Sequence, residues 1–240
     1  MEDFIARNKA RVATRGMANS RQKKLDKMER LDKGRVQIKP NFVFKEGRPS
    51  GKVLFNTTNL VLGYNRPLTK PINIEIVKGE HLVIKGINGV GKSTLIKSLV
   101  GDLALMQGTR KDSELLNIGY FAQHQMDALD GNASPMLQLA RIADKKISEA
   151  TLRAFLGSFG FSGERMDTPS ESFSGGERAR LALALIVWKR PNVLILDEPT
   201  NHLDLDMRHA LTMALQDFEG AVVLVSHERQ LVASVCDELI

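Results

Sequence analysis

The feature that most constrains this chain is the stretch from Gly86 to Thr94, which reads Gly-Ile-Asn-Gly-Val-Gly-Lys-Ser-Thr. It fits the pattern G-x-x-x-x-G-K-[ST], whose glycines let the backbone turn tightly enough for successive N–H groups to surround a phosphate. An apolar run ending at Ile84 precedes it, and the apolar spacing over 95–100 predicts a helix after it. Strand, glycine loop and helix form the context that a phosphate-binding loop requires. The stretch therefore predicts an α/β chain that binds a nucleotide.

Two side chains in this loop have defined chemistry. Lys92 places a positive charge where a phosphate would bind, and Ser93 offers a hydroxyl oxygen that can hold Mg²⁺. The following helix would point its unpaired N–H groups and its positive dipole end at the same phosphates. The alternative is a glycine-rich turn before an ordinary helix, and the flanking patterns disfavour it.

Composition narrows the class of protein. The chain has 240 residues, of which 42% are hydrophobic, and this is enough to bury a full core. Its single cysteine, Cys236, excludes an internal disulfide framework and suits a reducing compartment. The longest apolar run, 181–188, is too short to span a membrane, and the N-terminus lacks the apolar core of a secretory signal. We therefore expect a cytoplasmic protein without a membrane segment.

Positive charge is concentrated in the first 50 residues. They carry fourteen basic and six acidic side chains, a net charge of +8, whereas the whole chain carries +6 and residues 51–240 therefore carry −2. Residues 4–33 are rich in helix-forming types, with one glycine and no proline. The pattern predicts a basic helical arm over 1–50, ahead of a nucleotide-binding domain over 51–240.

The basic residues of this arm are open to two interpretations. Arg7, Arg11 and Arg15 recur every four residues and would share one face of a helix. The arm is either a solvated linker helix or a surface that contacts nucleic-acid phosphates, and charge alone does not decide between them. The further candidates for such contacts are Arg21, Lys23, Lys24 and Lys27.

Three apolar runs each end in residues that can do chemistry. The runs 118–122, 193–196 and 221–225 lack polar alternation, which is typical of strands buried on both faces of a parallel sheet. Ligands bind at the carboxyl ends of such strands. The residues found there, which would face the phosphate loop, are Gln123, Asp197, Glu198 and His227.

Two other β-prone stretches, 53–60 and 72–76, predict a small sheet beside the nucleotide site. Tyr64 lies between them in the sequence. Its ring either stacks on an adenine or lies at the rim without a ligand.

The segment between Gln123 and Ser174 has a helical pattern. Ser134 and Pro135 resemble an N-cap and a first helical residue, and an apolar face follows at 152–159. Ser174, Gly175 and Gly176 then precede a helix that ends at 189–191. These three residues form either a second phosphate-binding helix start or a plain turn.

The order of these motifs resembles that of an ATP-binding-cassette (ABC) domain. The resemblance covers residues 52–240, and it implies a P-loop α/β fold with a parallel core sheet, an antiparallel β subdomain and a small helical subdomain over about 124–180. The matching segments are 86–93, Gln123, 174–177, 193–198, 201–204 and His227, which resemble the P-loop, Q-loop, signature, Walker B, D-loop and switch histidine.

Within that superfamily the stretch 198–204, Glu-Pro-Thr-Asn-His-Leu-Asp, is similar to the ABC-F group, and 119–125 and 181–188 are similar to its YheS-like branch. The resemblance implies a factor that acts on the ribosome, with the basic arm corresponding to the linker helix that reaches toward tRNA. It also implies that each ATP lies between two cassettes. A second cassette is therefore expected, either in the same full-length chain or by homodimerisation, and the chain is expected to be a fragment that is truncated at its C-terminus.

The resemblance assigns roles to the matching residues. Asp197, Ser93 and Gln123 would hold Mg²⁺, and Lys92 would neutralise phosphate charge. Glu198 would act as the general base, with His227 positioning the attacking water and Gln123 assisting. The residues implied to contact ATP are Tyr64, Gly86, Asn88, Gly89, Gly91, Lys92, Ser93, Thr94, Ser174, Gly175, Gly176, Glu177 and Asp204.

Two other functions share the ATP motifs. The nucleotide-binding subunit of a membrane transporter needs no basic helix ahead of its cassette, and a DNA-repair or chromosome-organising ATPase usually carries a far longer coiled coil. The arm and the pair Asn201-His202 favour the ribosomal reading, with rRNA or tRNA as the partner.

Overall fold

The computed structural model describes residues 39–45, 47, 51–86 and 91–239. The predicted basic arm helix over 4–33, with all its candidate RNA contacts, lies outside these ranges, as do Asn88 and Gly89 of the phosphate loop. Within these ranges every helix falls short of the length and apolar character that a membrane crossing requires.

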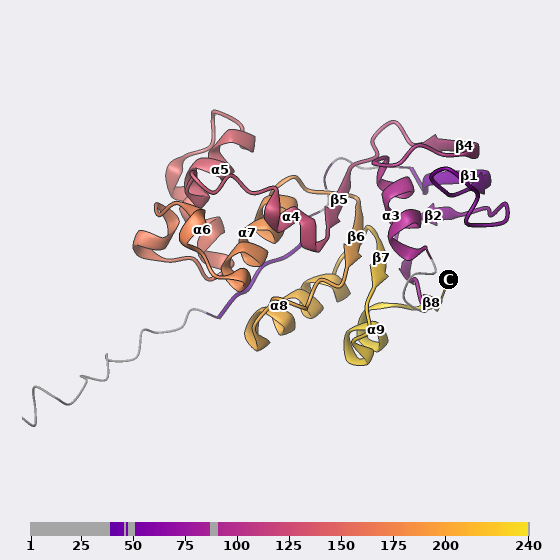
Figure 1. The fold of residues 1–240 in the computed structure, drawn as a ribbon. Coiled ribbons are helices and arrows are strands. Elements are labelled where there is room, and N and C mark those ends of the chain that lie inside the picture. Colours follow the sequence, from indigo (N-terminus) through magenta and orange to yellow (C-terminus); the bar gives the residue numbers. More distant parts are fainter. Residues whose placement is uncertain (1–38, 46, 48–50, 87–90, 240) are drawn as a thin grey trace, which may run out of the picture. The chain divides into compact units, whose positions relative to one another are not determined.

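A parallel sheet forms the centre of the described chain (Figure 1). Its strand order is β5-β6-β7-β3-β8, and all neighbouring strands are paired in parallel. The apolar runs of the sequence supply the strands, as predicted. Their bounds are β3 His81–Val83, β5 Ile118–Phe121, β6 Val193–Asp197, β7 Ala221–Val225 and β8 Glu238–Leu239.

Alternate residues of each central strand enter two separate apolar cores. Val193 and Ile195 of β6 pack with α3 (Lys92–Val100) on one face, whereas Leu194 and Leu196 pack with the helices of the other face. Burial on both faces explains why the strand is apolar at every position. The helices of this second face are α4 Gln123–Asp127, α5 Pro135–Ile142, α6 Glu149–Ser158, α7 Gly175–Trp188, α8 Leu205–Gln216 and α9 Arg229–Val235.

An antiparallel sheet of order β2-β1-β4 covers the α3 side, with bounds β1 Val53–Val61, β2 Glu75–Val77 and β4 Gln107–Asp112. The predicted strand over 72–76 is only partly formed. Thr57 binds Ile74 through both backbone and side chain: its N–H and its hydroxyl donate to the Ile74 carbonyl, and its hydroxyl accepts from the Ile74 N–H. The continuous strand covers Glu75–Val77, and an isolated bridge joins Leu60 to Ile72.

The helical subdomain lies between β5 and α7 in the sequence, as predicted. Ser134 caps α5 with Pro135 in its first turn, and Ser148 caps α6. Two short 3₁₀ helices, Gly163–Met166 and Ser170–Ser172, lead to α7. The apolar face predicted at 152–159 is buried at Leu152, Leu156 and Phe159.

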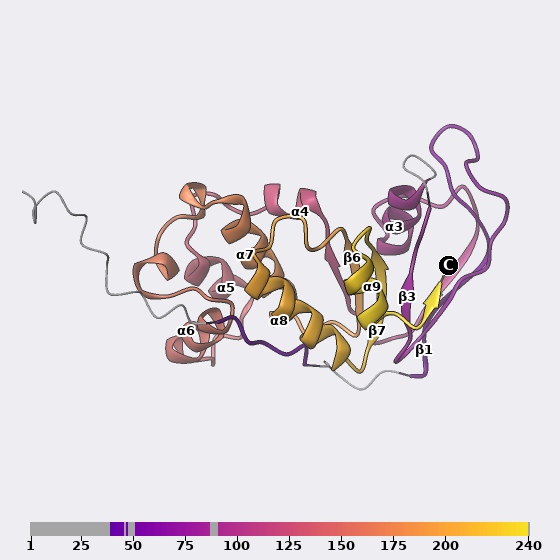
Figure 2. The same cartoon turned by 90° about the horizontal axis from the view of Figure 1, so that it is seen from below.

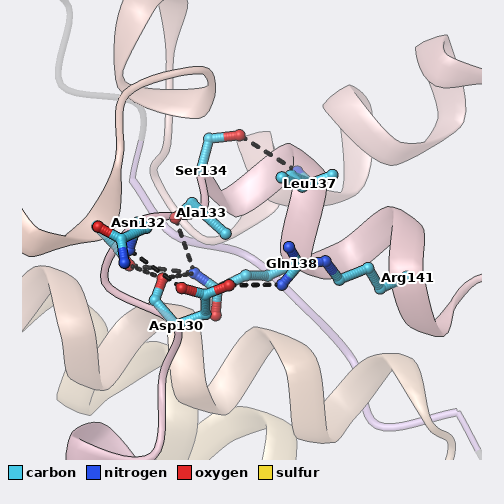
Figure 3. Close-up of polar contacts among 8 residues, drawn as sticks. Asp130, Asn132, Ala133, Ser134, Leu137, Gln138 and Arg141 are labelled. Atoms are coloured by element: carbon cyan, nitrogen blue, oxygen red, sulfur yellow. Dashed lines mark hydrogen bonds and ion pairs between the residues drawn. The ribbon is translucent and has the colours of Figure 1, made fainter.

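A buried amide fixes the loop that enters this subdomain (Figure 3). The Gln138 side chain donates to the carbonyl oxygens of Asp130 and Ala133 and to the Ser170 hydroxyl, at 3.0–3.1 Å. The Arg141 guanidinium donates to the Asp130 carboxylate at 2.6 Å. These bonds join α5 to the segment just before Ser174, so they hold the approach to α7 in place.

The segment 39–45, which we name the strap, packs against the cassette although the sequence assigned it to the arm (Figure 2). Phe42 stacks on Phe159 with ring centroids 4.3 Å apart, and Phe44 lies 5.5 Å from the Phe218 ring. The Asn41 N–H donates to the Ser158 carbonyl at 2.9 Å. The strap accordingly belongs to the same compact unit as the cassette and not to the arm, because two of its aromatic side chains are buried in the main core.

We expect Phe159→Ala to lower the free energy of unfolding by about 3–5 kcal/mol, because it leaves a cavity under Phe42 at a fully buried site. Urea unfolding followed by circular dichroism measures this change. Leu137→Ala is the control, since Leu137 is 48% exposed and its loss should cost less than about 0.5 kcal/mol. Equal losses in the two variants would contradict the packing described for the strap.

Candidate nucleotide-binding site

The phosphate loop enters α3 through a left-handed residue. Gly91, the N-cap of α3, has φ of 105°, a conformation that favours glycine. The Lys92 ammonium donates to the Gly86 carbonyl at 2.7 Å, so its side chain reaches back to the segment that follows β3. Thr94 is buried and Ser93 is exposed. The sequence pattern thus produces a helix start with a cation beside it.

Glu198 has a strained backbone at the end of β6. Its φ is 48°, which is unusual for a residue with a side chain. Its N–H donates to the Val225 carbonyl at 2.8 Å, and this bond continues the β6–β7 pairing one residue beyond β6. Among the described residues, its buried Oε1 has no hydrogen-bond partner. The Glu198 backbone is therefore held in a strained conformation, with its carboxylate at the ends of β6 and β7.

The carboxylate of Glu198 faces His227 across the strand ends. The His227 Nε2 lies 3.6 Å from Glu198 Oε1, and the His227 N–H lies 3.5 Å from Glu198 Oε2. These are long contacts, and they leave both groups able to bind something between or beside them.

Burial shifts the pKa of Asp197, at the end of β6, and of Tyr120, on the neighbouring strand β5. It raises the pKa of Asp197, and the positive charges of Lys92 and His124 act in the opposite direction. Burial also raises the pKa of Tyr120 to about 12, with smaller contributions from the charges of Asp197 and Asp102. A bound cation would favour the charged form of Asp197, so this carboxylate is suited to a metal.

One cavity of about 510 Å³ joins the phosphate loop to the strand ends. It brings together seven of the residues that the sequence predicted for the site, and it adds Asn201 and Val225. Asn201 follows Glu198 in a turn closed by its N–H and the Glu198 carbonyl at 3.3 Å. Its place within the 201–204 motif was the signal that could have identified it. The lining residues are Gly91, Lys92, Ser93, Thr94, Asp197, Glu198, Asn201, Val225 and His227.

Three other described residues that the sequence predicted for the site are not among the residues that line this cavity. Gln123 begins α4 directly after β5, so its backbone lies at the same edge of the sheet. Tyr64 is 58% exposed. Asp204 caps α8, where its carboxylate accepts from the Met207 N–H at 2.9 Å. This bond gives Asp204 a structural role, and its contact with ATP stays a prediction.

The signature segment starts α7 with a reciprocal cap. The Ser174 hydroxyl accepts from the Glu177 N–H, and the Glu177 carboxylate accepts from the Ser174 N–H at 2.9 Å. Gly176 lies so close to His202 that an added Cβ would be 3.0 Å from the His202 carbonyl oxygen. Within one chain this segment does not line the cavity described above.

The Glu177 carboxylate is held ionised. Burial acts to raise its pKa, but hydrogen bonds from Ser174 and the Arg165 guanidinium outweigh burial, and the pKa is lowered. A carboxyl whose pKa is lower in the folded state stabilises the fold at neutral pH, and this contribution is lost as the pH falls through the lowered value. The ionised Glu177 carboxylate therefore stabilises the start of α7 at neutral pH.

The residues at this edge of the sheet fit Mg²⁺ and a polyphosphate. The hard oxygen donors available are the Asp197 carboxylate and the Ser93 hydroxyl, which are ligands that Mg²⁺ prefers. Lys92 and the start of α3 supply the positive charge that phosphate oxygens need. Glu198 Oε1, which has no hydrogen-bond partner among the described residues and only a long contact to His227, lies where a water could be bound.

Known proteins match the chain at the levels of family, sequence and fold. A family model described as ABC transporter matches residues 69–201, and a second model with that description matches residues 1–44. The chain is 45% identical over its whole length to the probable ATP-binding protein YheS of Escherichia coli K12, and it spans 38% of that protein. It is 38% identical to the ABC transporter ATP-binding protein YfmM of Bacillus subtilis, with 99% of the chain and 45% of YfmM covered.

A plant protein and a solved structure are also similar to this chain. ABC transporter F family member 3 of Arabidopsis thaliana is 34% identical over the whole chain, which covers 34% of that protein. The ATP-binding subunit of an ABC transporter superposes with a TM-score of 0.68 at 22% identity, over 78% of this chain and 85% of the subunit. This likeness confirms the predicted fold class. The chain belongs to the ABC family of ATP-binding proteins, and its cassette is ABC-F-like, with YheS-like proteins among its relatives.

Proposed function

We propose that this chain hydrolyses ATP at the cavity between the phosphate loop and the ends of β6 and β7. The observation that carries the proposal is the convergence of Lys92, Asp197, Glu198 and His227, from three separate segments, on one cavity. Mg²⁺ held by Asp197, Ser93 and Gln123 would supply charge neutralisation at the phosphates.

The roles of the side chains follow from their positions. Lys92 would bind phosphate oxygens once it leaves the Gly86 carbonyl. Glu198 would orient a water and take a proton from it at Oε1, which has no hydrogen-bond partner among the described residues, and His227 would hold the same water from the other side. The tyrosine at 64 would lie at the adenine.

We further propose that the site is composite and that the chain works on the ribosome in the cytoplasm. The signature at 174–177 does not line the cavity of its own chain, so a second cassette would supply the signature that closes it. The ABC-F relative and the +8 charge of residues 1–50 support a role in translation, with the basic arm contacting rRNA or tRNA.

Co-sedimentation with ribosomes in the presence of ATP tests the ribosomal role. A variant with Arg7, Arg11 and Arg15 changed to Glu should lose binding, and raising the salt should weaken the unchanged chain in the same way. The matched control changes three exposed lysines outside the arm, Lys52, Lys70 and Lys111, to Glu with the same change in net charge. Equal loss in both variants would show general charge attraction and would count against the arm.

A further inference from the structure

A second cavity lies away from the ATP site, between the strap and the helical subdomain. Its volume is about 670 Å³. One wall is the strap, and the other is formed by α6, the end of α7 and the turn after it. The residues that line it are Asn41, Phe42, Val43, Lys45, Ile147, Thr151, Ala154, Phe155, Ser158, Val187, Trp188 and Arg190.

The walls of this cavity are aromatic and aliphatic, with cations among the polar groups. Phe155 and Trp188 lie edge to face with ring centroids 4.8 Å apart, and each is only partly buried. Lys45 and Arg190 are both exposed, and none of the described residues that line the cavity carries a carboxylate. An apolar planar group with a negative charge attached matches this combination.

The two backbone segments that carry Arg190 and Lys45 are held by contacts with the rest of the fold. Arg190 has φ of 51°, and the Asn117 amide donates to the carbonyls of Lys189 and Arg190 at 2.8 and 3.1 Å, which secures the turn after α7. The strap is fixed by the stacking of Phe42 on Phe159. Both sides of the cavity are therefore preformed, and a ligand would not have to order them.

We propose that this cavity is a seat for unpaired nucleotides of an RNA strand, with a base stacked on Trp188 and its flanking phosphates bound by Lys45 and Arg190. Stacking on aromatic rings beside basic side chains is how proteins hold single-stranded nucleic acid. In the sequence the strap follows the basic segment for which we propose RNA contacts. The choice of RNA rests on the proposed ribosomal function.

The chain carries its own reporter, because Trp188 is its one tryptophan. A short oligouridylate added to the full chain, without ATP, should quench the Trp188 fluorescence in a saturable way. An abasic oligonucleotide of equal length keeps the phosphates and lacks the bases, so it should not quench. Ala154→Phe fills the cavity from α6 and should weaken the quenching affinity by about tenfold or more.

Two variants change exposed side chains, so that a loss of RNA binding in them does not come from a loss of folding. Lys45→Gln and Arg190→Gln alter exposed side chains, and each should reduce the slope of log affinity against log salt by about 0.7. Lys70→Gln, an exposed lysine outside the cavity, should leave the slope unchanged.

Four results would overturn the seat. They are no quenching by oligouridylate, equal quenching by the abasic strand, quenching by polyglutamate but not by oligouridylate, or an unchanged affinity in all three cavity variants. If quenching is absent while ribosomes still bind, this inference fails and the proposed function stands. If ribosomes do not bind while oligouridylate quenches the Trp188 fluorescence, the proposed function fails and the inference about this cavity stands.

Discussion

A Glu198→Gln variant is expected to bind ATP as tightly as the unchanged chain and to lose ATP turnover by at least about a hundredfold. Glutamine preserves the size of the side chain and the backbone bond to the Val225 carbonyl, so the cavity keeps its shape. Its amide cannot accept a proton from water. The variant should therefore remain in the ATP-bound, closed state.

Phosphate release and equilibrium ATP binding, measured where the unchanged chain turns over, provide the two readouts. Glu219→Gln is the matched control, because Glu219 is exposed and lies before β7, at the opposite end of the strand from the site. It should change neither quantity. Unchanged turnover in Glu198→Gln would reject the assignment of the general base.

ATP turnover per chain is expected to rise with chain concentration in dilute solution, or on addition of a second cassette, and to be weak or absent in the isolated monomer. The reason is that the signature at 174–177 lies outside the cavity of its own chain. Ser174→Asp should abolish turnover, because it keeps the N-cap of α7 but adds a negative charge where a phosphate would bind. Ser174→Asn keeps the cap without the charge and is its control.

A mixing experiment isolates the composite site. Lys92→Ala chains and Ser174→Asp chains should each be inactive alone. Their mixture should recover turnover, since one intact phosphate loop can then face one intact signature. Robust turnover by a demonstrated monomer, or a mixture as inactive as its components, would contradict a shared site.

Local sequence patterns predicted those parts of the site whose structure is determined by residues close to them in the sequence. The glycine loop before α3 and the apolar runs β5, β6 and β7 were all visible, because a left-handed glycine and a strand buried on both faces leave direct marks on a sequence. The parallel order of the sheet then places Asp197, Glu198 and His227 at one edge.

Long-range packing accounts for what the sequence did not reveal. Phe42 and Phe44 stand in a basic segment next to Pro40, and only the presence of Phe159 and Phe218 makes them core residues. Only the last two residues of the strand predicted over 72–76 belong to β2; before them the Thr57 hydroxyl accepts from the Ile74 N–H, a contact between residues 17 positions apart. The strain at Glu198 likewise has no signature in the residue type.

Calorimetric titration of ATP with Mg²⁺ into the unchanged chain and into Lys92→Ala measures whether the cavity beside Lys92 binds ATP. We expect saturable binding to the unchanged chain and its loss in the variant, because Lys92 is the ammonium group that lines the cavity beside the phosphate loop. Equal binding in both proteins, or none in the unchanged chain, would contradict it.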